Sequence, residues 1–113
     1  MTDCARTIQW ADRSDTFDLG HPWVRNVLDY RGLPGQFGNT PAACLKRFED
    51  GVYSIDDVER VIELGLIGGG MLEDDADALI DAHVRNKPIA PNAVVAFEVL
   101  AALFVGANND AGA

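Results

Sequence analysis

The chain has 113 residues, of which 9 are basic and 18 acidic, so its formal net charge is −9. The length predicts one domain, placed at residues 1–107, with a flexible polar tail at 108–113. A hydrophobic fraction of 48% excludes a disordered chain. The negative charge argues against binding nucleic acid or an anionic membrane through a basic surface. No stretch is apolar enough to span a bilayer and no signal peptide is visible, so we expect a cytoplasmic protein with reduced thiols.

The acidic residues are concentrated in the second half of the chain. Residues 54–113 carry eleven acidic and three basic side chains, a net charge of −8. The ordinary interpretation is a solvated acidic face opposite a buried one. The alternative is an acidic rim around a binding surface for a basic partner.

Residues 6–19 are predicted to form a β-hairpin. Segments 7–10 and 16–19 alternate apolar with polar residues, and turn-forming residues occupy 11–15 between them. The alternation places four apolar side chains on one face: Ile8, Trp10, Phe17 and Leu19. An isolated hairpin is only marginally stable, so this one must pack on helices or find further strands in a partner.

The rest of the domain, residues 22–107, is predicted to be helical. The fold class is therefore mainly α with a small N-terminal hairpin, a compact bundle of four to five short helices. Proline suits the first helical position because its missing N–H would have no partner there, so we expect helices to begin at Pro22, Pro41 and Pro91. Thr40 precedes the second of these prolines as an N-cap.

The middle helix carries the strongest helical pattern in the chain. Ser54 is an N-cap and Asp57 follows three residues later, close to a capping box. Apolar or small residues then recur at helical spacing, at Ile55, Val58, Val61, Ile62, Gly65 and Leu66. The glycines at 68–70 end this helix, and the acids at 73–75 suit the start of the next one.

The last helix is apolar on nearly all sides. Between Ala93 and Ala107 the one charged residue is Glu98. Such a helix is usually the centre of a core, and the alternative is that part of it is exposed and binds a partner. The candidate partner-binding residues are Val95, Val99, Leu103 and Phe104 in this helix and Trp23 in the first.

No motif predicts catalysis, a cofactor or a metal. The Gly68–Gly70 run lacks the Gly-Lys-Ser/Thr ending of a phosphate loop, and the acids after it would repel a nucleotide. A calcium loop has a bend-forming glycine among its acids, whereas here the glycines precede the acids, which are expected on the first turn of a helix. The histidines, His21 and His83, have no partner at zinc spacing, and no pattern links Cys44 to either of them as a nucleophile. We therefore expect a protein that is not an enzyme.

Several segments in the second half resemble a known family. They are 45–51 (LKRFEDG), 54–58 (SIDDV), 61–71 (VIELGLIGGGM), 78–81 (ALID), 88–93 (PIAPNA) and 100–106 (LAALFVG). In this order they resemble the small tail proteins of gene transfer agents and related prophages, which belong with the phage tail-assembly chaperones and are sometimes labelled tail tube proteins. The match covers roughly residues 40–106.

The resemblance implies a non-enzymatic role in which the chain binds tail proteins, such as the tape measure or tube subunits, and keeps them soluble. Two alternatives remain open. The hairpin edges of a structural tail component could extend a sheet between subunits in the finished particle. An acidic regulator would instead bind a basic protein electrostatically, in a salt-sensitive manner.

Overall fold

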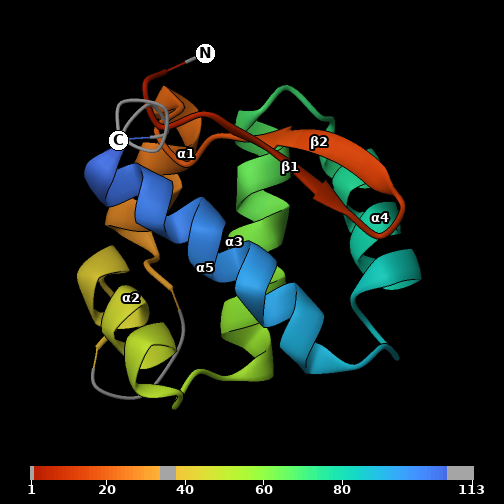
Figure 1. The fold of residues 1–113 in the computed structure, drawn as a ribbon. Helices are drawn as coiled ribbons and strands as arrows, with labels where there is room; N and C mark the ends of the chain where they lie inside the picture. The colour runs from red at the N-terminus through yellow and green to blue at the C-terminus, as the bar shows by residue number, and fades with distance from the viewer. Residues whose placement is uncertain (1, 34–37, 107–113) are drawn as a thin grey trace.

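The computed structural model describes residues 2–33 and 38–106, so the predicted tail at 108–113 lies outside the described residues. The elements are β1 (Arg6–Trp10), β2 (Arg13–Phe17), α1 (Pro22–Tyr30), α2 (Pro41–Asp50), α3 (Ile55–Gly68), α4 (Glu73–His83) and α5 (Ile89–Val105). The predicted fold class, mainly helical with an N-terminal hairpin, is confirmed (Figure 1).

The hairpin is tighter than the sequence predicted. Strands β1 and β2 pair antiparallel, with Trp10 opposite Arg13. Ala11 and Asp12 alone form the turn, with φ of 47° and 63°, as two-residue turns of type I′ require. The predicted turn at 11–15 is therefore too long. Polar residues 13–15 join the strand because β1 supplies backbone partners and Asp15 binds both the Trp10 indole (2.8 Å) and Arg13 (2.6 Å).

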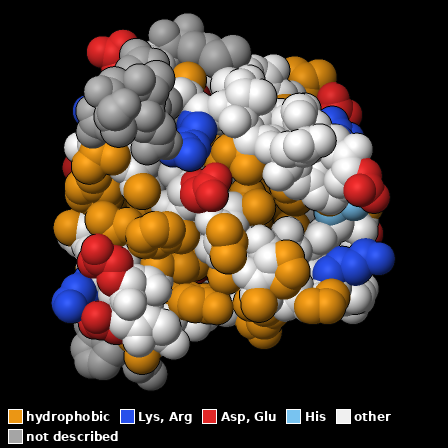
Figure 2. All heavy atoms as spheres, in the orientation of Figure 1, with side chains coloured by type: hydrophobic (Ala, Val, Ile, Leu, Met, Phe, Trp, Pro, Cys, Tyr) orange, Lys and Arg blue, Asp and Glu red, His pale blue; other side chains and the backbone are white. Residues whose placement is uncertain are grey.

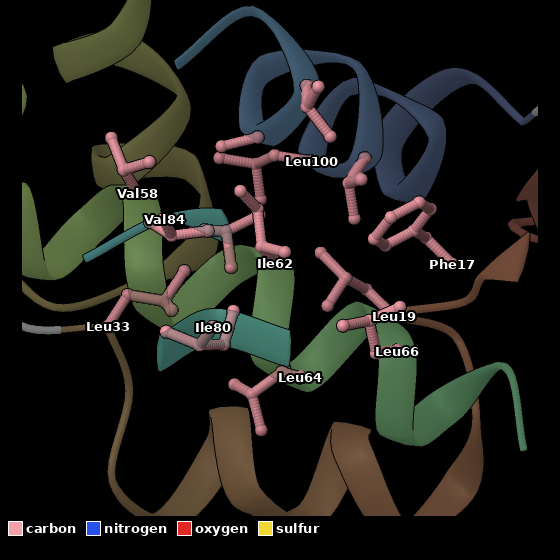
Figure 3. Close-up of a cluster of buried hydrophobic side chains, with 14 of the residues drawn as sticks. Phe17, Leu19, Leu33, Val58, Ile62, Leu64, Leu66, Ile80, Val84 and Leu100 are labelled. Carbon is pink, nitrogen blue, oxygen red and sulfur yellow. The ribbon is translucent and has the colours of Figure 1, made fainter. Parts of the chain in front are cut away.

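The apolar face of the hairpin packs on the helices as expected. Its four predicted inward side chains, Ile8, Trp10, Phe17 and Leu19, are at most 7% exposed. Figure 3 shows Phe17 and Leu19 pointing toward side chains of α3 and α5. The hairpin therefore gains its stability from one shared core.

The central helix is α3, which contacts α5, β2, α4 and α1. Figure 1 shows α5 crossing α3 on one side, with α4 beside α3 and the hairpin above. Gly65 makes the close crossing possible, since a Cβ there would lie 2.9 Å from Val99 Cγ1 and 3.0 Å from Phe17 Cδ2. The interpretation of α5 as the centre of the core is therefore wrong, and α5 is a covering helix with one exposed face.

Most helix ends follow local chemistry. The Thr40 hydroxyl accepts from the Ala43 N–H, and Ser54 and Asp57 form the full capping box. The start of α5 is a correction, because it begins at Ile89, two residues before Pro91. First-turn N–H groups have no acceptor inside the helix, so a proline is tolerated throughout that turn.

The glycines at 68–70 end α3 against the hairpin. A Cβ on Gly68 would overlap the carbonyl oxygen of Asp18, and one on Gly69 would overlap that of Thr16. The end of α3 therefore lies against the backbone of β2 and of the residue that follows it, which no residue with a side chain permits. The predicted helix stop is confirmed, and close packing on the hairpin segment requires glycine at both positions.

Candidate partner-binding surface

Helix α5 has a buried face and an exposed one. The buried residues are Asn92, Ala93, Val95, Ala96, Val99, Leu100 and Ala102. Val95 is 8% exposed and Val99 1%. The expectation that these two valines are exposed for a partner is wrong, because they fall on the side of α5 that packs on α3 and α2. Leu103 is partly buried against the same core.

The exposed face carries an unbroken apolar line, which we call the α5 stripe: Ala90, Val94, Phe97, Ala101 and Phe104. Their spacing of three or four residues places them along one side of a helix. The stripe spans about 21 Å at 1.5 Å per residue. Its larger side chains remain in contact with solvent, with Val94 58%, Phe97 37% and Phe104 46% exposed.

Charge is nearly absent from this side of α5. Glu98 is the single charged residue of the helix, and it lies 3.9 Å from Arg6 of β1. Figure 2, in the orientation that places α5 in front, shows hydrophobic side chains gathered across this face. The α5 stripe is therefore suited to another apolar surface.

A groove of about 650 Å³ lies beside the C-terminal end of the stripe. Leu103 and Phe104 form one wall, and Leu28 of α1 and Pro41 of α2 contribute to the others. Two of the predicted partner-binding residues thus lie in one concave site. Their partner-binding role remains a prediction.

Trp23 does not belong to this surface. It is 43% exposed and lines a different groove, between α1, α3 and α4. Tyr30, about two turns further along α1, lines the same groove and is 93% exposed. Tyr30 was not predicted as a binding residue, although its seven-residue spacing from Trp23 indicates that both aromatic residues share a helix face.

A buried ion pair connects α2 to α3. Arg47 donates to Asp57 through Nε (2.9 Å) and Nη2 (2.8 Å), and through Nη1 to the carbonyl of Gly38 (2.7 Å). Burial alone would raise the pKa of Asp57, but the hydrogen bonds from Arg47 and from the Ser54 N–H lower it below its ordinary value. The sequence predicted Asp57 as a capping residue and gave no sign of its buried partner.

Cys44 and His83 lie in different surroundings. Burial, followed by the nearby Asp57 carboxylate, raises the pKa of the Cys44 thiol to about 12, so this cysteine is protonated at neutral pH. His83 lies edge-on to Trp10 with ring centroids 6.0 Å apart. Across the described residues, no group of three or more His, Cys, Asp and Glu side chains is arranged to hold a metal ion.

Within residues 2–33 and 38–106, no helix combines the length and hydropathy needed to cross a membrane. The fold and its exposed apolar helix define a small helical protein whose most prominent surface is suited to binding another protein.

The family model for "Phage tail tube protein, GTA-gp10" matches residues 3–106, and the chain therefore belongs to that family. The expected resemblance to small tail proteins of gene transfer agents and phages is thereby confirmed, and a role in a phage-type tail follows. No curated protein and no solved structure matches the chain.

Proposed function

We propose that this chain is a tail-assembly chaperone that acts in the cytoplasm of the host bacterium and is not an enzyme. It binds a helical segment of a tape-measure protein or of a tail tube subunit and keeps that segment soluble until the tail forms. The observation that carries this proposal is the α5 stripe, an apolar helix face with nothing from the described part of the chain packed over it.

The chemistry of the stripe selects the type of client. An amphipathic helix binds by placing its own apolar face against a hydrophobic surface, with anchors spaced by three or four residues. A length of about 21 Å accommodates about four turns of such a helix. Complete burial of a valine or phenylalanine side chain contributes about 1.5–3 kcal/mol, so covering Val94, Phe97 and Phe104 would supply a useful part of the binding free energy.

The overall charge also suits a chaperone. A net charge of −9 on a chain of 113 residues favours solubility and discourages self-association. A complex with an otherwise insoluble apolar client would share this property.

Co-expression with a tape-measure fragment tests the proposal. We expect the wild-type chain to raise the soluble fraction of the fragment and to co-purify with it. The double variant F97S/F104S should lose both effects while keeping its own helical circular dichroism, because both side chains lie at the surface and outside the buried core.

The matched control is I55S/L72S, which also removes two exposed apolar side chains, with 57% and 72% exposure, from positions outside α5. This control should behave like the wild type. No complex with either the tape measure or tube subunits, or an equal loss in the two double variants, would contradict the proposal.

A structural tail component is the second candidate, because the family description names a tail tube protein. A tube built as a barrel needs enough strands to close a wall, and the described residues contribute one hairpin with five residues in each strand. Mass spectrometry of purified particles separates the two candidates. A chaperone should be absent from the particles, whereas a tube subunit should be abundant.

A further inference from the structure

A groove of about 740 Å³ lies between α1, α3 and α4, and we call it the acidic groove. Trp23 and Val27 of α1 and Ile67 of α3 provide its apolar wall. Its carboxylates come from α3 and the first turns of α4: Glu63, Glu73, Asp74 and Asp77. Three helix faces therefore converge on one hollow that combines apolar and acidic side chains.

The acidic groove lies on the far side of α3 from α5. Gly65 faces Val99 of α5, whereas Glu63 lines the groove. Two residues along an α-helix differ by about 200° around its axis. The groove and the α5 stripe are thus separated by the central helix and the core.

The carboxylates of the groove are only partly neutralised. Arg60 lies 3.8 Å from Glu63 across one turn of α3, and Arg85 lies 3.4 Å from Asp77. Among the described residues no basic side chain pairs with Glu73 or Asp74. Arg31 also lines the groove, so four carboxylates face two arginines there, and the groove presents a net negative charge to its occupant.

A second hollow, of about 360 Å³, continues the acidic groove along α3. The two share Arg31, Arg60 and Glu63, and the charged residues that the second adds are Asp56, Glu59 and Arg85. From Asp56 to Ile67 the lined face of α3 is about 17 Å long, enough for about three turns of a bound helix.

We propose that the acidic groove binds an amphipathic helix of a partner protein that carries lysine or arginine beside its apolar residues. The basic side chains pair with the carboxylates of α3 and α4, while the apolar ones pack on Trp23 and Val27. This surface is separate from the α5 stripe and does not depend on the proposed chaperone role.

Charge complementarity selects this occupant over a second copy of the chain. The most apolar helix that a second copy could offer, α5, brings Glu98 as its one charged residue. The chain as a whole carries −9, so two copies repel at this face. A basic partner would instead replace water around carboxylates that already lie close together.

The state of Glu63 is consistent with such a site. Burial raises the pKa of its carboxyl above the ordinary value, and the nearby Asp77 and Glu73 raise it further, against the opposing effects of Arg60 and Arg85. A partner cation in the groove would stabilise the ionised form.

A synthetic peptide of about 14 residues, long enough to form a helix on binding, tests the proposal. One version has leucines along one face flanked by lysines, and the other has glutamates in place of the lysines. Two-dimensional NMR resolves the indole N–H signals of Trp23 in the groove and Trp10 in the core. We expect the lysine peptide to shift the Trp23 signal and the glutamate peptide to leave it unchanged.

Two groove variants and a matched control locate the site. E73Q/D74N should weaken binding of the lysine peptide about fivefold, from the loss of two exposed charge pairs, and W23S should weaken it without touching α4. The control D12N/E49Q makes the same change in net charge at exposed positions outside the groove and should bind within twofold of the wild type, as should F97S/F104S.

Equal shifts of the Trp23 signal by the two peptides, equal affinities of E73Q/D74N and D12N/E49Q for the lysine peptide, or peptide-induced shifts confined to α5 would each overturn the proposal. Circular dichroism of E73Q/D74N confirms that α4 still forms. Because F97S/F104S is expected to bind the lysine peptide normally, failure of this proposal is distinguishable from failure of the chaperone role.

Discussion

The two sides of helix α3 differ in the side chains that surround them. Helices α3 and α4 together carry nine acidic residues, whereas α5 carries one. On the α5 side, apolar side chains fill the core and continue outward into the stripe. On the other side, carboxylates border a groove. The negative charge of the chain is therefore one-sided, and it leaves the apolar surface uncharged and accessible.

The largest effect should come from Asp57, an acidic residue of α3 that is buried and not part of the groove. Asp57 is completely buried, at 0% exposure, and paired with Arg47. Asp57→Ala removes the carboxylate that neutralises the buried charge of Arg47, which costs about 3–5 kcal/mol. Chemical denaturation monitored by circular dichroism measures the loss.

The neighbouring Asp56→Ala is the matched control, because Asp56 is exposed and acts only near the helix N-terminus, where removal costs less than about 1 kcal/mol. The double variant R47M/D57L should lose less than Asp57→Ala alone, since it removes both charges. Equal losses in the free energy of unfolding for the two single variants would show that the Arg47–Asp57 pair does not add to stability.

A smaller loss of stability should distinguish the buried face of α5 from its exposed face. Val99→Ala removes two methyl groups from a side chain that is 1% exposed, and we expect a loss of about 2 kcal/mol. Val94→Ala makes the same chemical change at 58% exposure and should cost less than about 0.5 kcal/mol. Thermal or urea unfolding of the pair measures both, and equal values would contradict the assignment of buried and exposed faces.

The smallest effect should appear in the pH dependence of stability. Lowering the pH should favour folding through Glu63 of the acidic groove and oppose it through the buried aspartates Asp57 and Asp18. Burial raises the pKa of Glu63 above 4.5, so its contribution to stability is complete below pH 4.5 and is lost as the pH rises through the folded-state pKa. Glu63→Gln should remove the small gain in unfolding free energy that the wild type shows on acidification from neutral pH.

Asp57 and Asp18 behave in the reverse way. Burial opposes ionisation of Asp18, but hydrogen bonds from the Thr2 hydroxyl and from the backbone N–H groups of Thr2 and Gly20 lower its pKa below 3.8. The stability contributed by both aspartates is complete above pH 3.8 and declines as the pH falls through their folded-state pKa values. A free energy of unfolding that rises steadily below pH 3 would contradict both assignments.

The parts of the fold that depend on neighbours in sequence were predictable. Thr40 and the pair Ser54–Asp57 mark helix starts because a cap acts within three residues, and Gly51 marks a helix end because its φ of 72° suits a residue without a side chain. The hairpin face was predictable for the same reason, because alternation is a local pattern.

The exposed face of α5 could not be predicted because its sequence has no periodicity to show it. Val94, Val95 and Val99 are chemically identical, and only the position of α3 decides which of them is buried. The acidic groove depends in the same way on how α1, α3 and α4 meet. Trp23 was predicted as a binding residue, but nothing in the sequence assigned it to a separate surface from Phe104.

The glycine run at 68–70 sets a limit on how the sequence of this chain can vary. Gly68 and Gly69 leave no room for a Cβ against the backbone of the hairpin segment, and Gly70 has open space but a φ of 111° that disfavours any other residue. A saturation library should therefore tolerate almost no replacements across these three positions. The glycine triplet resembles a nucleotide-binding loop in sequence. In this chain, two of its glycines are required because the hairpin backbone packs directly against them.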